Sequence, residues 1–162
     1  MMEFEPIGSI RTQYTSREGM PRQGAVASDS KGLVEVFDEY AEGLSDIGGF
    51  SHLILLFHLD RSKDHSLKVI PFADDSPRGV FSTRAPRRPN QIGMTVVRLI
   101  SVDGNKLTVS GIDMLDGTPL LDIKPYNPDI DPHPDAKTGW MGDKLAKQAM
   151  ADERFGTGGE PQ

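Results

Sequence analysis

The chain has 162 residues, 36% of them apolar and 26% charged, which suits one folded domain and excludes a disordered chain. Cysteine is absent, so disulfides, thiolate metal sites and a cysteine nucleophile are excluded. The net charge of −6 argues against broad, nonspecific nucleic-acid binding but leaves room for a local basic face.

The first predicted strands are short and bounded by turn residues. Residues 4–10 are interrupted by Pro6 and Gly8 and predict an edge strand, because proline cannot donate to an interior ladder. Residues 15–32 are rich in glycine and predict a loop, after which residues 33–37 are strand-like.

A short helical piece then leads into the most apolar run of the chain. Asp38 is a candidate N-cap for one or two helical turns over residues 38–44, and a Gly-Gly pair ends that piece. Residues 50–59 are almost uniformly apolar, which predicts a strand buried on both faces. His52 and His58 occur in this run at an even spacing, which places both on one face of the strand.

Further strands and a hairpin follow. The strand-like segments occupy residues 67–72, 79–83, 93–102, 106–112 and 120–123. Asp103-Gly104-Asn105 is a hairpin signal between two of these segments.

The last part of the chain predicts little β structure. Four prolines make residues 125–139 a loop, and apolar residues then recur every four positions, as in an amphipathic helix. We therefore expect a β-barrel domain over residues 3–140, a C-terminal helix over residues 141–155 and a disordered tail over residues 156–162.

Many short strands separated by glycine and proline turns indicate a mainly β sandwich or barrel. The usual doubly wound nucleotide fold is not expected, because the sequence has no βαβ rhythm and no Gly-x-Gly-x-x-Gly between a strand and a helix. No run approaches the roughly 18 apolar residues of a membrane span, and the acidic start lacks a signal peptide's basic residues. We expect a cytoplasmic protein.

Arginine is concentrated in one proline-stiffened segment. Arg78, Arg84, Arg87 and Arg88 fall within eleven residues. Prolines lower the entropy that a loop loses on binding, and guanidinium groups present forked donors to carboxylates and phosphates. The segment is a candidate ligand-binding loop, and the alternative is a solvated basic turn.

A second polar segment surrounds a turn at Asp116-Gly117. The carboxylates of Asp113 and Asp122 could accept hydrogen bonds from a ribose or an amine, and Lys124 and Tyr126 could handle a proton or a phosphate. The alternative is a hairpin with ordinary caps.

These two segments resemble the two signatures of the TrmO, or TsaA-like, family. The first runs from Gly79 to Thr95 and contains Thr83-Arg84 and Ile92-Gly93-Met94, and the second runs from Asp113 to Tyr126. Two shorter family elements match Pro21-Arg22-Gln23 and Phe50-Ser51-His52-Leu53 with Phe57-His58. The four blocks occur in family order across residues 4 to about 140.

The resemblance implies a single-sheet β-barrel, a homodimer with its ligand pocket near the subunit interface, and S-adenosylmethionine as methyl donor. It implies transfer to the exocyclic nitrogen of threonylcarbamoyladenosine beside the tRNA anticodon. From the residues themselves we expect neither a metal nor a membrane partner. Cofactor contacts are expected at Pro21, Arg22, Gln23, His58, Leu59, Arg84, Met94, Asp113, Met114, Leu115 and Asp116. Tyr126, Lys124 and Asp113 are the expected catalytic residues.

Methyl transfer needs the nucleophile held in line, roughly 3 Å from the methyl carbon. Arg22 or Arg84 could bind the methionyl carboxylate. The acceptor nitrogen must lose its proton, and Tyr126, Asp113 or His58 could take it. Larger bacterial members of the family carry a further C-terminal domain that is expected to help hold tRNA, so a small-molecule acceptor is the first alternative.

Two further alternatives belong to other classes of protein. One is a non-enzymatic module that binds S-adenosylmethionine or a nucleotide. The other is a metal-dependent hydrolase, for which Asp129, Asp131, His133 and Asp135 could supply divalent-metal ligands, although their spacing matches no metal motif. Trp140 is interpreted as a core or interface aromatic rather than a base-stacking platform.

Overall fold

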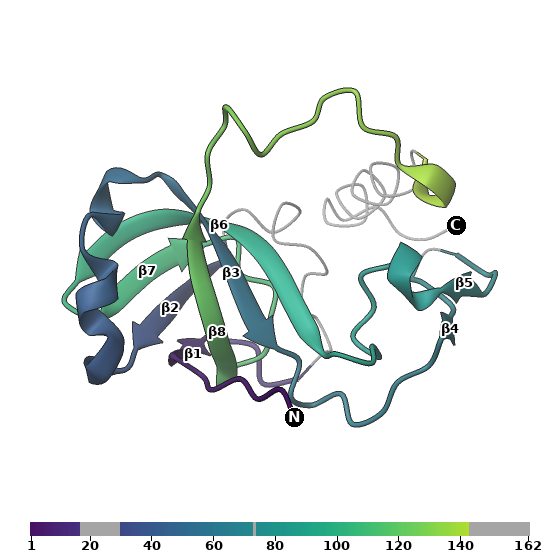
Figure 1. Ribbon diagram of the computed structural model, residues 1–162, viewed down its shortest axis with the longest axis horizontal. Helices are drawn as coiled ribbons and strands as arrows, with labels where there is room; N and C mark the ends of the chain where they lie inside the picture. The colour runs from purple at the N-terminus through teal and green to yellow at the C-terminus, as the bar shows by residue number, and fades with distance from the viewer. Residues whose placement is uncertain (17–29, 73, 143–162) are drawn as a thin grey trace, which may run out of the picture.

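The computed structural model describes residues 1–16, 30–72 and 74–142, and six antiparallel strands of this part of the chain form one closed barrel (Figure 1). Around the barrel the strands follow the order β1-β2-β7-β6-β3-β8. Their bounds are β1 (Gly8–Arg11), β2 (Lys31–Val36), β3 (His52–His58), β6 (Ile92–Asp103), β7 (Lys106–Ser110) and β8 (Thr118–Pro125). The predicted mainly β, single-sheet barrel is confirmed.

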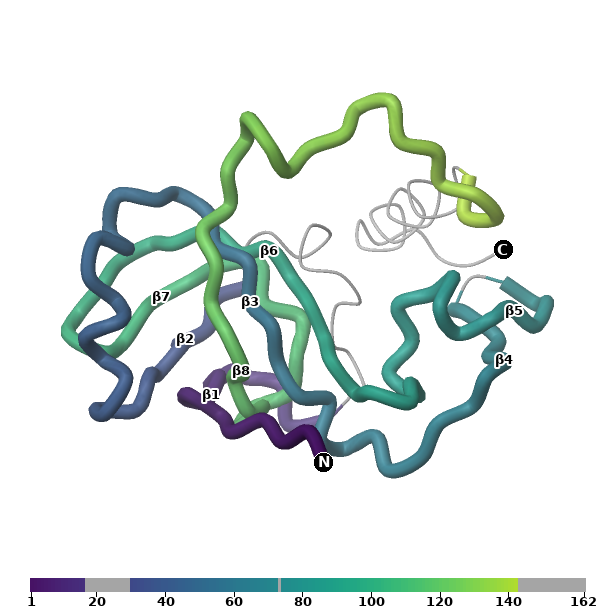
Figure 2. Tube along the Cα trace, viewed as in Figure 1, coloured from purple at the N-terminus to yellow at the C-terminus, as the bar shows by residue number. Residues whose placement is uncertain are grey.

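A small second sheet lies beside the barrel. It consists of β4 (Lys68–Val69) and β5 (Arg78–Gly79), and 3-10 helix η3 (Val80–Ser82) follows it directly. Helices η1 (Asp38–Leu44) and η2 (Ile47–Gly49) cover the opposite side of the barrel (Figure 1). Residues 126–138 leave β8 and arch across to η4 (Gly139–Met141), near the small sheet (Figure 2).

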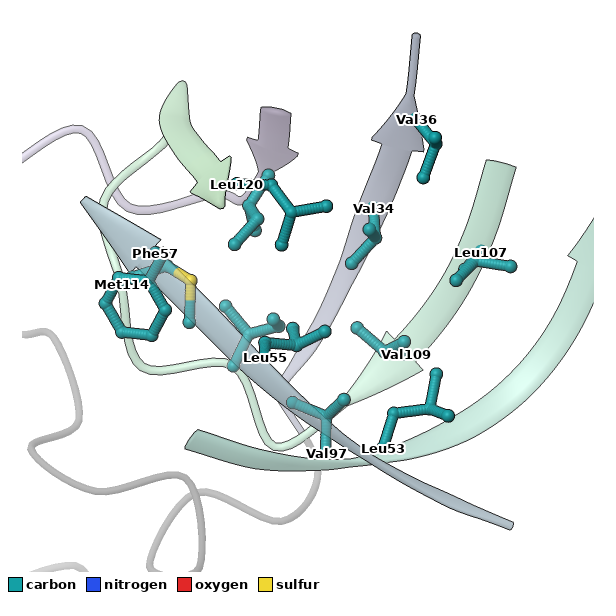
Figure 3. Packing of buried hydrophobic residues seen from close by; sticks show 12 residues of the cluster. Val34, Val36, Leu53, Leu55, Phe57, Val97, Leu107, Val109, Met114 and Leu120 are labelled. Carbon is teal, nitrogen blue, oxygen red and sulfur yellow. The ribbon is translucent and has the colours of Figure 1, made fainter. Parts of the chain in front are cut away.

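Alternating side chains fill the barrel interior. The fully buried members of this core are Ile10, Val34, Val36, Leu53, Leu55, Val97, Leu107, Val109, Ile112 and Leu120. Figure 3 shows how they interdigitate, together with Phe57 and Met114. Side chains just fill the interior of an eight-stranded barrel, and a six-stranded one is narrower. A ligand must therefore bind outside this barrel.

The predicted hairpin is confirmed between β6 and β7. Asp103 pairs with Lys106, so the connection has two residues, and Gly104 adopts a φ of 58°. Two-residue hairpin turns require a positive φ at that first central position, which glycine adopts without steric cost.

Two expectations about the first half of the chain are wrong. β1 is not an edge strand, because it pairs with both β2 and β8 and closes the barrel, while Pro6 lies before the strand. Asp38 is not the N-cap of η1, since Phe37 occupies that position and Asp38 starts the helix. The Asp38 carboxylate instead accepts a hydrogen bond from Asn105 Nδ2 at 3.2 Å.

Two expectations about strand extent are also wrong. β3 is buried on its inner face only, because Ile54 and Leu56 are half-buried and the histidines at both ends are exposed. Residues 79–83 are not a strand beyond Gly79, since Val80–Ser82 form η3 and fold back through a Thr83 N to Val80 O hydrogen bond of 3.1 Å.

Candidate functional site

The outer face of the β8–β3–β6 sheet collects several of the predicted site residues. Directly opposite residues of antiparallel strands project from the same face. Lys124 of β8 lies opposite Ile54, and Met94 of β6 lies opposite Leu56. His58 is the last residue of β3, the strand of Ile54 and Leu56. Like them it alternates with the buried residues of β3, so it also faces outward. Three strands thus present predicted cofactor and catalytic residues to one surface.

This outer face is unusually apolar for a surface. Its apolar members are Ile54, Leu56, Ile92, Met94 and Val96, the last three of which are 39–49% exposed. Contiguous exposed apolar side chains mark interaction sites. The face is therefore a candidate interface as well as a candidate ligand surface.

The loop between β7 and β8 is held at the His58 end of the barrel by backbone and side-chain hydrogen bonds. Asp116 Oδ1 accepts from the Thr12 amide at 3.0 Å, and the Asp116 amide donates to the Tyr14 carbonyl at 2.7 Å. Arg61, three residues after His58, donates to the Asp116 carbonyl. The end of β3 and the β7–β8 loop therefore lie side by side.

Contacts with the barrel core also hold the β7–β8 loop in place. Met114 is 4% exposed and packs in the barrel core, and its carbonyl accepts from Thr12 Oγ1 at 3.0 Å. Asp113 and Leu115 on either side are half-buried. The predicted cofactor residues of this loop are thus preorganised, and Leu59 at the end of β3 packs against the same core.

The structure separates the predicted catalytic Tyr126 from the predicted cofactor residues at the end of β3. The Tyr126 ring packs edge-on against His52 with centroids 6.2 Å apart, and the Tyr126 amide donates to the His52 carbonyl at 3.1 Å. His52 and His58 are six residues apart on one strand, which corresponds to roughly 20 Å. Lys124 lies between them in register, opposite Ile54, and its Nζ is 2.9 Å from Asp122 Oδ2. Within one chain, Tyr126 and His58 therefore lie at opposite ends of β3.

Arg84 belongs to a region that we call the basic lobe, defined as residues 60–91 between β3 and β6. The lobe joins the barrel at its base, where the Leu59 amide donates to the Gln91 carbonyl at 2.8 Å. Arg88 Nη1 braces the loop around Arg84 by donating to the carbonyls of Thr83 and Ala85, at 2.8 and 3.1 Å. The side chain of Arg84 itself is exposed.

Trp140 attaches the arching segment to the basic lobe. Its Nε1 donates to the Ser82 carbonyl at 2.8 Å, and the Arg78 guanidinium lies 5.2 Å from its ring centroid. Arg78 also forms an ion pair with Asp74, with Nε and Oδ2 2.8 Å apart. Trp140 is therefore an interface aromatic, as expected from the sequence.

A groove of about 560 Å³ lies elsewhere, between η1, η2 and β8. The carboxylates of Glu39, Glu42 and Asp122 line it, together with Tyr40 and Phe50. Apart from Asp122, none of the candidate site residues that the structure describes is among its lining residues. Carboxylates would repel both a methionyl carboxylate and phosphates, so this groove is a poor candidate for the cofactor or a nucleic acid.

The acidic segment after β8 is not arranged for a metal. Among the described residues, no three His, Asp or Glu side chains gather to hold a metal ion. Asp131 Oδ2 instead accepts from the Asn127 amide at 2.6 Å, and Asn127 Oδ1 accepts from the Asp129 amide at 2.9 Å. The Asp131 carboxylate and the Asn127 amide oxygen thus stabilise local turns, and the metal-hydrolase alternative finds no gathered ligand set among the described residues.

Some predicted residues cannot be placed, and some structural anchors were not predicted. Pro21, Arg22 and Gln23, the C-terminal helix beyond Gly142 and the tail lie outside the described residues. The sequence reasoning missed Thr12 and Arg61, which fix the β7–β8 loop across 104 and 55 positions of the chain. The only sequence signal for Arg61 is its position just after the apolar run.

The fold and the site together define a class of protein. A filled antiparallel barrel that presents polar and apolar residues on its outside, next to a basic lobe, is a small β-barrel ligand-binding domain and not a doubly wound nucleotide enzyme. None of the helices in the described part of the chain is both long and apolar enough to cross a membrane.

Comparison with known proteins identifies the family. Residues 9–132 match the family model of the tRNA-methyltransferase O N-terminal domain, so the chain belongs to the tRNA-methyltransferase O family. An S-adenosyl-L-methionine-binding protein of Archaeoglobus fulgidus is 42% identical over 80% of this chain and 93% of its own length. The mouse tRNA (adenine(37)-N6)-methyltransferase is 36% identical over 91% of this chain, but only over 36% of its own length.

A solved structure supports the same assignment. The crystal structure of TrmO from Pseudomonas aeruginosa superposes with a TM-score of 0.73 at 38% identity, covering 86% of this chain and 62% of that one. The chain therefore spans less than two thirds of that protein and about a third of the mouse enzyme.

Proposed function

We propose that this chain is an S-adenosylmethionine-dependent methyltransferase that methylates the exocyclic N6 of threonylcarbamoyladenosine next to the tRNA anticodon. The observation that carries the proposal is the outer face of the β8–β3–β6 sheet, where three strands of a family-matched barrel present His58, Met94 and Lys124, with the fixed β7–β8 loop at the His58 end. Relatives with the same matched domain are named for S-adenosylmethionine binding and for tRNA adenine N6 methylation.

The residues at the His58 end fit the chemistry of the cofactor. Leu59, Leu115 and Met94 offer partly exposed apolar surface for an adenine ring, and the half-buried Asp113 offers a carboxylate for hydroxyl or ammonium groups. Arg84 would bind the methionyl carboxylate. When bound, S-adenosylmethionine supplies an electrophilic methyl group.

The chain's own part in the reaction is positioning and proton handling. The hydrogen bonds from Thr12 and Arg61 to Asp116 hold the β7–β8 loop still, so little ordering entropy is lost when a ligand binds. Lys124 and Tyr126 lie further along the same face and would contact the nucleotide, and Asp113 would accept the proton of the acceptor nitrogen.

We also propose a homodimer that forms through the apolar outer face. Ile92, Met94 and Val96 are 39–49% exposed on adjacent outward positions of β6. A two-fold interface over these residues would remove them from water and would bring a second copy of Tyr126 or Lys124 toward the His58 end. This arrangement accounts for the distance of roughly 20 Å between Tyr126 and His58 within one subunit. Because the proposed substrate is tRNA, the proposed compartment is the cytoplasm.

The test combines turnover with binding. Labelled methyl transfer is measured to tRNA that carries or lacks the threonylcarbamoyl group, and calorimetry measures S-adenosylmethionine binding to wild type, Arg84→Ala and the control Lys106→Ala on β7. We expect transfer only to the modified tRNA, and binding weakened about tenfold or more by Arg84→Ala alone. Binding without transfer to any tRNA would favour the binding-module alternative, and no binding to folded protein would refute the proposal.

A further inference from the structure

The basic lobe has a charge opposite to that of the rest of the chain. Residues 60–91 contain seven Lys or Arg and four Asp or Glu, a net charge of +3. Since the whole chain carries −6, the other residues together carry −9. Such asymmetry concentrates attraction for a polyanion on one part of the molecule.

Local partners neutralise only part of this positive charge. Arg87 forms a forked ion pair with Asp64, at 3.1 Å from Nε and 3.2 Å from Nη2, and Arg78 pairs with Asp74. Arg61 and Arg88 donate to backbone carbonyls, which satisfy hydrogen bonds without cancelling charge. Lys63 and Lys68 are exposed on the same lobe. The lobe therefore keeps a positive surface.

The same lobe exposes large apolar side chains. Leu67, Ile70 and Phe81 are 63%, 65% and 75% exposed. A single exposed phenylalanine is ordinary, but an exposed aromatic ring on a lobe that also carries basic residues and other exposed apolar groups is the composition of a single-stranded nucleic-acid platform.

Phe81 is exposed although its backbone is firmly held. The neighbouring Val80 is 1% exposed, and its amide donates to the Leu67 carbonyl at 3.0 Å. The Ser82 hydroxyl donates to the Gly79 carbonyl at 2.8 Å, and the Ser82 carbonyl accepts from Trp140. A rigidly presented ring loses little entropy on stacking, which favours a role in recognition.

We infer that the basic lobe is the RNA-contacting surface of this protein, and that Phe81 stacks on an unpaired base while Lys63 and Lys68 contact phosphates. Single-stranded loops are recognised by aromatic stacking, and Lys and Arg bind the phosphate backbone. The inference rests on the proposed function for the identity of the RNA, an anticodon loop. The inference adds two things to the proposed function, namely the surface that contacts RNA and the residue that stacks on a base. A second copy of the chain is the competing occupant, because the rest of the molecule is acidic.

The experiment measures RNA affinity independently of methyl transfer. A fluorescently labelled anticodon stem-loop and a fully paired RNA duplex are titrated with wild type, Phe81→Ala, Phe81→Trp and the control Phe50→Ala. Phe50 is also an exposed phenylalanine, 41% accessible, but it lines the acidic groove. Thermal melts check folding, and light scattering gives the mass in solution.

We expect Phe81→Ala to weaken stem-loop binding by about fivefold to a hundredfold, the range that base–aromatic stacking supplies, and Phe81→Trp to retain it. Duplex binding and the Phe50→Ala variant should be unchanged. Lys68→Ala should weaken both RNAs alike and lower the salt dependence by about one counterion, while Lys106→Ala should not.

The outcomes separate this inference from the proposed function. Unchanged stem-loop affinity in folded Phe81→Ala refutes the inference, even if wild type methylates tRNA. If Phe81→Ala changes the mass in solution relative to wild type and leaves the RNA affinity unchanged, the lobe binds a second copy of the chain, and the inference is refuted. Loss of stem-loop affinity in Phe81→Ala supports the inference even if wild type transfers no methyl group.

Discussion

A substitution at Gly93 tests how tightly the barrel core packs around Phe57. It lies opposite Phe57 in the β3–β6 ladder, and a Cβ added at Gly93 would lie 2.2 Å from Phe57 Cε2 and 2.5 Å from Cζ. The ring is 5% exposed and belongs to the same core cluster as Met114 (Figure 3). The Gly93→Ala variant therefore forces the ring toward neighbours that are already packed.

The expected magnitude is the difference between two effects. Inserting a methyl group into a packed core costs typically 1–3 kcal/mol. Replacing glycine by alanine recovers about 0.4–1 kcal/mol, because the unfolded chain has fewer conformations to lose. Overpacking is the larger effect, so Gly93→Ala should lower the free energy of unfolding by about 1–2 kcal/mol, or the melting temperature by roughly 2–8 °C.

Urea denaturation and thermal melts measure the loss, and two variants serve as comparisons. A Cβ at Gly48 has no atom within 4 Å, so Gly48→Ala should not destabilise the protein. Phe57→Leu removes the ring that clashes, so Gly93→Ala should cost at least 1 kcal/mol less in the Phe57→Leu background. Strictly additive losses in the double variant would refute the clash as the cause.

Two further predictions concern the anchors of the site. Asp116→Ala leaves the Thr12 amide without its 3.0 Å acceptor and should cost about 1–3 kcal/mol in urea unfolding, with weaker calorimetric binding of S-adenosylmethionine. Stability equal to that of wild type would show that this side-chain hydrogen bond does not stabilise the loop. Trp140→Phe removes the donor to the Ser82 carbonyl and should raise the rate of proteolytic cleavage between β8 and η4. The free energy of unfolding of the whole protein should fall by only about 1 kcal/mol. An unchanged cleavage rate would show that this contact does not hold the arching segment.

Features that depend on local chemistry were predictable from the sequence. The β6–β7 hairpin follows from Gly104 and the alternation on both flanks, and the Asp103–Lys106 pairing confirms it. The family blocks, read in order, also predicted the closed barrel. Local propensity alone left a sandwich and a barrel equally open, because the sequence pattern of short alternating strands is common to both.

Features that depend on pairing between distant residues were not predictable. Barrel closure requires β1 to pair with β8, more than a hundred residues away, and no local signal in β1 distinguishes a paired strand from an edge. The apolarity of β3 was misread for a related reason. Two of its five apolar side chains, Ile54 and Leu56, face outward, and a surface that joins another molecule has the same composition as a buried one.

The filled interior of the barrel determines what kind of site this fold can offer. With Leu53, Leu55 and Leu120 fully buried, the barrel contributes walls and not a cavity, so the predicted residues of β3, β6 and β8 lie on an open surface. An open surface cannot exclude water from a methyl transfer, and exclusion is needed for charged and polar groups to act strongly. A second wall must therefore cover the His58 end when the site is complete. Within the described part of the chain, the basic lobe has the position and chemistry to provide it, and in the proposed homodimer a second copy on the apolar face would also do so.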